Sequence, residues 1–118
     1  MKTLIAALLI VAPVAAAAQD YRPVTDRATF MQLVQGRSLT QRLLGVALTV
    51  TDDGRISGDA MGGTVTGSWT WDDGYFCREM AWGSRVFPQN CQRIDLNGDL
   101  LRFTADKGAG DDATLRIR

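Results

Sequence analysis

The sequence predicts a mainly β fold: an antiparallel meander of seven or eight strands, curled into a small barrel or a sandwich, with one short N-terminal helix. Three observations lead to this prediction. From residue 39 onward, apolar and polar residues alternate over short stretches, which is the period of a half-buried strand. Turn sequences such as Asp72-Asp73-Gly74 and Asn97-Gly98 separate these stretches at even intervals. Helical spacing occurs once in the mature chain, before residue 36.

The first 18 residues are typical of a secretory signal peptide. A positively charged start (Met1-Lys2-Thr3) precedes an apolar run over residues 4–11 and a small-residue cleavage site at Ala16-Ala17-Ala18. The run is shorter than the roughly 20 residues that a membrane-spanning helix needs. We therefore expect residues 19–118 to form one periplasmic or secreted domain that is monomeric and no longer associated with a membrane.

The predicted helix begins at an N-cap formed by Thr25 or Asp26 and ends at about Gln35, with Gly36 as its stop. Its apolar residues share one face at helical spacing: Phe30, Leu33 and Val34. We expect this face to plug or cap the sheet.

The predicted strands are centred on residues 44–50, 56–60, 64–71, 76–82, 94–96, 101–103 and 115–117. Most connections between them are tight turns, but two are longer. Residues 83–90, which include Pro88, are expected to form a loose loop, and residues 106–112 a glycine-rich loop. A sheet of this many strands is expected to curl, because open sheets twist strongly.

Residues 67–92 contain all three tryptophans, both cysteines and the only glutamate. Two cysteines in an exported chain favour a disulfide between Cys77 and Cys91. Closing so short a loop contributes about 3 kcal/mol in the chain-entropy description. For a small domain this is a large share of the total stability.

Strand parity places both cysteines on the outer, polar face. Cys77 alternates with apolar residues of its strand, and Cys91 shares its face with Arg93. A disulfide between them is expected to bring Glu79 close to Arg93 and to allow one exposed ion pair.

Composition and motifs argue against several classes of function. The 13 basic and 13 acidic residues balance, which argues against nucleic acid as a partner. The chain has no histidine, so histidine-dependent triads are excluded and a zinc site is disfavoured. It also lacks nucleotide-binding glycine motifs, and no cofactor is expected.

The carboxylates leave two alternatives open. The loop at residues 106–112 supplies acidic oxygens of the kind calcium binds, although a plain polar hairpin connection needs no ion. Asp52-Asp53 and Asp72-Asp73 each precede glycine and are turn formers, and a hydrolase pair drawn from them is the alternative.

The candidate ligand-binding residues are arginines and tryptophans on or beside the central strands. Arg78 and Arg85, together with Arg93 and Arg102, are suited to clamping a carboxylate or phosphate. Parity places Arg78 on the inward face, where an arginine needs a partner: an acid, backbone carbonyls or a ligand.

Trp69, Trp71 and Trp82 also occupy inward positions. They are expected either to fill the core or to line a partly open aromatic pocket, because small barrels can hold one ligand. Tyr75 with Phe87-Pro88 is the alternative, an exposed recognition edge.

The segments Gly67-Ser68-Trp69 and Asp73-Gly74-Tyr75-Phe76-Cys77 resemble those of small calycin-like proteins exported by bacteria, among them periplasmic inhibitors of lysozyme and of metalloproteases. The resemblance implies a meander closed by a disulfide. The lysozyme inhibitors use a Ser-Gly-x-x-Tyr loop, whereas here Ser57-Gly58 is followed by Asp59-Ala60-Met61 and the tyrosine is missing.

The mature chain also resembles small exported bacterial proteins that sometimes carry the name dihydrodipicolinate reductase. A nucleotide-dependent reductase requires a dinucleotide-binding βαβ unit, and no stretch of this chain supplies one. This second resemblance therefore implies an architecture and not an activity.

We expect an exported, non-enzymatic protein that binds a small ligand or a periplasmic partner protein, with enzyme inhibition and carboxylate-based hydrolysis as alternatives. The ligand hypothesis predicts an apolar cavity near Trp69, Trp82 and Arg78. The inhibitor hypothesis predicts a filled core and a projecting loop at residues 83–90 or 105–112. The hydrolase hypothesis predicts two acids facing each other across a cleft.

Overall fold

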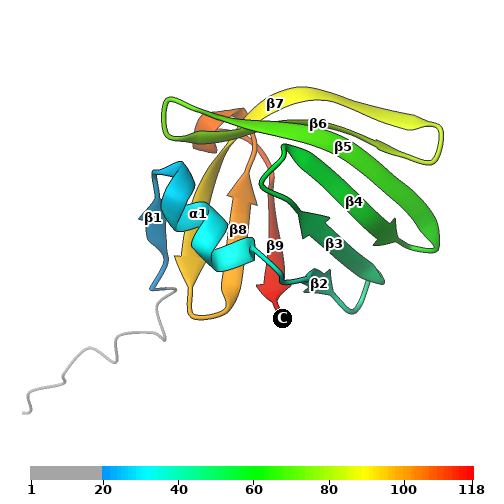
Figure 1. The fold of residues 1–118 in the computed structure, drawn as a ribbon, viewed down its shortest axis with the longest axis horizontal. Coiled ribbons are helices and arrows are strands. Elements are labelled where there is room, and N and C mark those ends of the chain that lie inside the picture. The colour runs from blue at the N-terminus through cyan, green and yellow to red at the C-terminus, as the bar shows by residue number, and fades with distance from the viewer. Residues whose placement is uncertain (1–19) are drawn as a thin grey trace, which may run out of the picture.

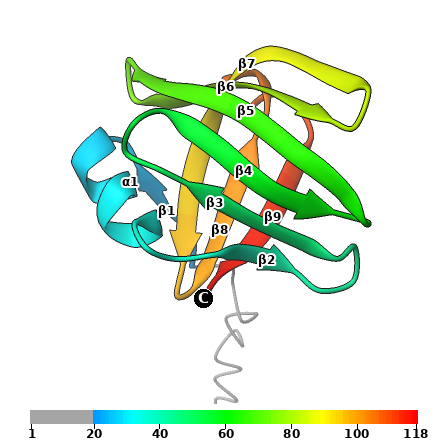
Figure 2. The same cartoon turned by 45° about the vertical axis from the view of Figure 1, so that its right-hand side comes forward.

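The computed structural model describes residues 20–118, which form a closed barrel of eight antiparallel strands with one additional strand and one α-helix (Figures 1 and 2). The predicted signal peptide lies outside the described residues. The barrel strands are β2 (Leu39–Gln41), β3 (Val46–Val50), β4 (Arg55–Ala60), β5 (Gly63–Asp72), β6 (Tyr75–Trp82), β7 (Arg85–Asn97), β8 (Leu100–Thr104) and β9 (Asp112–Ile117). The other elements are β1 (Arg22–Val24), α1 (Arg27–Val34) and a short 3-10 turn, η1 (Asp106–Gly108).

Each barrel strand pairs with its neighbour in sequence, and β2 pairs with β9 to close the ring. In that closing pair Leu39 lies opposite Ile117. The predicted antiparallel meander is thus confirmed. Because the sheet closes on itself, it forms the barrel and not the sandwich. No helix among residues 20–118 is long and apolar enough to cross a membrane.

Strand β1 was not predicted, because its three residues carry no alternating pattern. It pairs with the second half of β7, placing Pro23 opposite Asp95. Strand β7 is long enough to serve several neighbours: its first half pairs with β6, and its second half pairs with β1 on one edge and β8 on the other.

The turn after β7 lies one residue beyond its predicted position. Asn97 pairs with Leu100, so the turn consists of Gly98 and Asp99. Gly98 has φ of 61° whereas Asp99 has no positive φ, and a two-residue turn with positive φ at its first position alone favours glycine there. The turn after β5 follows the prediction, since Asp73 and Gly74 both have positive φ.

The predicted loose loop at residues 83–90 is wrong. Only Gly83 and Ser84 form a turn, and β7 begins at Arg85. The irregularity that Pro88 suggested is a bulge: Phe87 lies opposite Met80, but Asn90 lies opposite Arg78, so β7 carries one extra residue. Proline has no N–H to donate to a ladder, which favours a bulge at this point.

Helix α1 closes one end of the barrel (Figure 1). Its N-cap is Asp26, whose side chain accepts a hydrogen bond from the Thr29 backbone N–H at 2.9 Å. The helix buries Phe30, Met31 and Val34, while Leu33 is only partly buried.

An aromatic cluster fills this closed end. The Phe30 ring centroid lies between 5.1 and 5.6 Å from those of three barrel aromatics. These are Trp69, Trp71 and Phe76. The helix is therefore a plug with a dense core beneath it.

Candidate functional site

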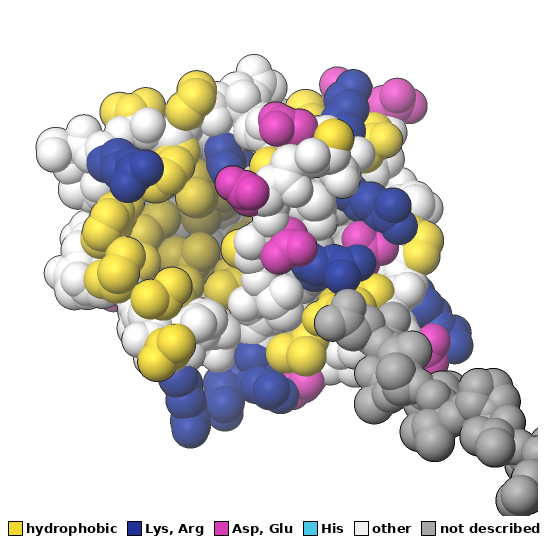
Figure 3. All heavy atoms as spheres, turned by 180° about the vertical axis from the view of Figure 1, so that it is seen from behind, with side chains coloured by type: hydrophobic (Ala, Val, Ile, Leu, Met, Phe, Trp, Pro, Cys, Tyr) yellow, Lys and Arg dark blue, Asp and Glu magenta, His cyan; other side chains and the backbone are white. Residues whose placement is uncertain are grey.

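The other end of the barrel, where the turns after β2, β4, β6 and β8 lie, holds a cavity of about 580 Å³ that opens to solvent. Figure 3 shows this hollow, with hydrophobic side chains gathered inside it and charged side chains around it. Its walls are mainly apolar and include Val46, Leu48, Met80, Trp82, Phe87 and Leu115. Ligand pockets commonly have volumes of about 300–1,000 Å³ and apolar walls.

Small residues help to keep this end open. Ala60 and Ala113 line the cavity, where larger side chains would fill it. Gly67 on β5 does not line the cavity but allows β6 to approach closely, since a Cβ there would lie 2.5 Å from the Glu79 carbonyl oxygen. The helix plugs only the opposite end, so nothing in residues 20–118 covers the mouth.

Trp82 lines the cavity, which is one of the two roles expected for it from the sequence. Its indole lies against Gly63, where a Cβ would come within 2.4 Å of Nε1. The indole N–H donates to the Ala60 carbonyl oxygen at 2.7 Å. Trp82 is therefore a fixed apolar wall whose polar atom is already satisfied.

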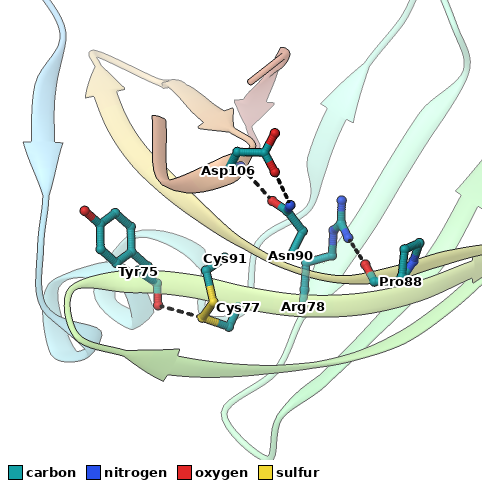
Figure 4. Close-up of a disulfide and its surroundings, with 7 residues drawn as sticks. All are labelled: Tyr75, Cys77, Arg78, Pro88, Asn90, Cys91 and Asp106. Atoms are coloured by element: carbon teal, nitrogen blue, oxygen red, sulfur yellow. Dashed lines mark hydrogen bonds between the residues drawn. A yellow bond between two sulfur atoms is a disulfide. The ribbon is translucent and has the colours of Figure 1, made fainter. Parts of the chain in front are cut away.

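Arg78 also lines the cavity, so its predicted inward direction is confirmed. One guanidinium nitrogen donates to the Pro88 carbonyl oxygen at 2.9 Å (Figure 4). Among residues 20–118, no carboxylate oxygen lies within 4.0 Å of its guanidinium nitrogens. Burial lowers the pKa of Arg78 from its ordinary value, yet arginine stays protonated at neutral pH.

Arg85 lies at the exposed rim of the cavity, with its guanidinium 4.9 Å from the centre of the Phe87 ring. Two exposed acids, Asp111 and Asp112, complete the charged part of the lining. The rim thus carries both signs of charge. The deeper part carries Arg78.

Gln92 is the site residue that the sequence analysis missed. It lies opposite Phe76, lines the cavity and is only 9% exposed, and its side chain forms no hydrogen bond within residues 20–118. The signal was available, because position 92 has the same parity as the inward residues Ile94 and Leu96.

Trp69 does not line the cavity. It is 4% exposed and packs in the closed end, where its indole N–H donates to the Thr51 carbonyl oxygen at 2.9 Å. Of the two predicted roles, the structure places it in the core. The reason is its distance along β5 from the open end.

Arg93 and Arg102 do not join the cavity either. Both lie on the outer face beside Asp95, which is 1% exposed and 3.1 Å from Arg93 Nη2 and 3.6 Å from Arg102 Nη2. The predicted pair between Glu79 and Arg93 is wrong, because in an antiparallel pair two steps forward from Cys77 correspond to two steps back from Cys91. Glu79 instead accepts a hydrogen bond from the Ser68 hydroxyl.

The predicted disulfide is confirmed: Cys77 and Cys91 lie directly opposite each other and are bonded. Cys77 is buried although it lies on the outward side of β6. Figure 4 shows that the segment after β8 is held close by, through hydrogen bonds that link Asn90 on β7 with Asp106. The loop at residues 106–112 is therefore anchored to β7 at one end.

The acids considered for hydrolysis or metal binding do not converge. Asp52 pairs with Arg27 and Asp53 with Arg55, in a turn separate from the one that holds Asp72 and Asp73. Within residues 20–118 no three His, Cys, Asp or Glu side chains are grouped so that they could hold a metal ion. Neither acid pair lines the cavity.

The alternative recognition edge is not assembled. The Tyr75 ring lies under the Lys107 ammonium at 5.3 Å, whereas Phe87 lines the cavity at the open end. These two aromatics therefore belong to different parts of the barrel.

Comparison with known proteins identifies no relative: no family model, curated protein or solved structure matches this chain significantly.

Proposed function

We propose that this chain is an exported, non-enzymatic binding protein that takes a small ligand into the open end of its barrel. The observation that carries the proposal is the asymmetry of the interior. One end is filled by α1 and an aromatic cluster, while the other holds an apolar cavity of about 580 Å³ open to solvent. Eight-stranded barrels are of a size to hold one small ligand.

The same proposal includes export of the chain and a relationship to calycin-like proteins. The N-terminal 18 residues support export, and so does the disulfide, because disulfides persist in oxidising compartments. The closed up-and-down barrel is compatible with a calycin-like relationship. The proposal describes a mature monomer that works in the periplasm or outside the cell without a cofactor.

A neutral, polarity-sensitive dye such as N-phenyl-1-naphthylamine tests the cavity directly. We expect its fluorescence to rise on titration with the mature protein. Leu48→Trp, which places a large ring in the cavity, should abolish the rise. Ala47→Trp is the matched control, because Ala47 is exposed on the outer side of the same strand. A dye response that is absent, or equal in both variants, would refute the proposal.

A partner protein is the second candidate, and exposed apolar side chains at the open end favour it. Leu43 and Val86 are 89% and 73% exposed, and Met61 is 54% exposed at the cavity mouth. An inhibitor of this kind would dock these turns against an enzyme. Native mass spectrometry of the protein isolated without reductant separates the candidates: a bound small molecule supports the ligand, and a bare monomer directs the search to partner proteins.

A further inference from the structure

Arg78 carries unused hydrogen-bonding capacity inside the cavity. A guanidinium has five N–H donors, and the only hydrogen bond that the Arg78 side chain makes within residues 20–118 is the one to the Pro88 carbonyl oxygen. Arg78 shares the cavity lining with apolar side chains such as Met80 and Leu48, and no carboxylate oxygen among residues 20–118 lies within 4.0 Å of its guanidinium nitrogens. A charge that is partly removed from water is stabilised by a partner, because desolvation is costly. A ligand with an anionic group would supply the missing partner.

Gln92 is an independent observation that points to the same place. The residue is nine-tenths buried and lines the cavity, its amide forms no hydrogen bond within the described part of the chain, and the amide atoms are not fully buried. Its amide is therefore free to bond to a molecule inside the cavity, since polar groups shielded from bulk water usually have a partner. Since Phe76 lies opposite Gln92 and Arg78 lies opposite Asn90, Arg78 and Gln92 are diagonal neighbours, with backbones about 7–8 Å apart. Side chains of this length can reach one small oxyanion together.

The other charged groups of the cavity lie farther out. Asp111 and Asp112 are exposed, and so is Arg85, which stacks on Phe87. At the rim, water screens these charges. The half-buried Arg78 is therefore the charge that a ligand meets inside, and it opposes a cationic ligand while favouring an anionic one.

We propose that the ligand is an amphiphile with one anionic head, a carboxylate or an oxyanion of similar size, on an apolar chain. This inference rests on the proposed function and names the ligand class of the same cavity. The head accepts two N–H bonds from Arg78 and one from the Gln92 amide, and the chain lies along Met80 and Trp82 toward the mouth. Paired N–H bonds from a guanidinium fit a carboxylate well.

Three probes with the same ten-carbon chain test the head group: decanoate, decanol and decyltrimethylammonium, each titrated calorimetrically into the mature protein. We expect decanoate to bind at least about tenfold more tightly than decanol, since hydrogen bonds to charged groups stabilise by about 1.5–3 kcal/mol. The cationic probe should bind more weakly than decanol.

Two variants assign the roles. Arg78→Met keeps the length of the side chain and removes its charge, and it should weaken decanoate binding about tenfold or more while leaving decanol unchanged. Gln92→Leu should weaken decanoate by a smaller factor, about threefold to tenfold. The control is Arg42→Met, which removes the same charge from an exposed position outside the cavity lining and should leave all three affinities unchanged.

The possible failures are distinguishable. If neither the neutral dye nor any ten-carbon probe binds, the proposed function fails and this inference fails with it. If decanol and decanoate bind equally, or Arg78→Met leaves decanoate unchanged, the cavity binds ligands but the head-group inference is wrong. If Arg78→Met does not fold, the comparison of the three probes on the unmodified protein still shows whether the cavity prefers an anionic head group.

Discussion

Replacing Trp69 with alanine tests the division of the barrel into a filled end and an open end. The indole is 4% exposed, and its centroid lies 5.6 Å from that of Phe30 and 5.5 Å from that of Phe76. Truncating a buried aromatic to alanine costs about 3–5 kcal/mol. The lost hydrogen bond to the Thr51 carbonyl oxygen adds about 1 kcal/mol. The expected loss of about 4–6 kcal/mol is a large part of the roughly 5–15 kcal/mol that stabilises a domain.

Urea denaturation followed by circular dichroism measures this loss. Because Trp69→Ala can leave the protein largely unfolded, Trp69→Phe provides a second measurement. It keeps a ring against Phe30 but removes the N–H, and we expect it to cost about 1–2 kcal/mol. Trp82→Phe is the matched control at the open end. It should weaken dye binding and cost less unfolding free energy than Trp69→Phe, because Trp82 lines the cavity and is only half-buried.

Two results would contradict this reasoning. A loss below about 1 kcal/mol in Trp69→Ala is too small for a buried aromatic and would place the residue at the surface. Weaker dye binding with unchanged stability would instead move Trp69 into the ligand site.

Three further predictions concern stability. Replacing Cys77 and Cys91 together with alanine should cost about 3 kcal/mol and lower Tm by roughly 12–24 °C; reductant should do the same to the unmodified protein, and no change in either melt would refute the staple. Hydrogen bonds from the Thr29 backbone N–H and hydroxyl hold the pKa of Asp26 below its usual 3.8. The ionised carboxylate therefore adds to the free energy of unfolding above pH 3.8, and this stabilisation is lost as the pH falls further. In urea titrations Asp26→Asn should remove this fall in stability at low pH, and an unchanged pH dependence would contradict the cap. Gly67→Ala should cost about 1–3 kcal/mol in the same assay, because its Cβ would lie 2.5 Å from a backbone oxygen, and a neutral result would show that β5 and β6 can move apart.

The sequence-based prediction of the site depended on the alternation of side chains between the two faces of a strand. A strand turns alternate side chains to opposite faces, so the inward direction of Arg78 and Trp82 follows from the apolar residues beside them. The same rule points to Gln92, which shares the parity of Ile94. Parity cannot say how far along the barrel an inward residue lies, and for that reason Trp69 and Trp82 were predicted together although they belong to opposite ends.

Register was the weaker part of the prediction. The pairing of Glu79 with Arg93 ignored the opposite directions of the two strands, and Pro88 suggested a loop where the structure has a bulge. Strand β1 was missed because its three residues are held by pairing with β7 and not by a pattern of their own. These features depend on which strands pair with each other. Local sequence patterns do not contain that information.

The sequence by itself determined the antiparallel meander, one helix capped at Thr25 or Asp26 and the disulfide between Cys77 and Cys91, because each follows from local periodicity or from the pairing chemistry of nearby residues. Only the tertiary structure decided that β2 meets β9, that α1 plugs one end and that the other end stays open. Closure and cavity are properties of the whole ring. They depend on how the inward side chains of eight strands and one helix share the interior volume, and that sum is fixed only when all of them are in place.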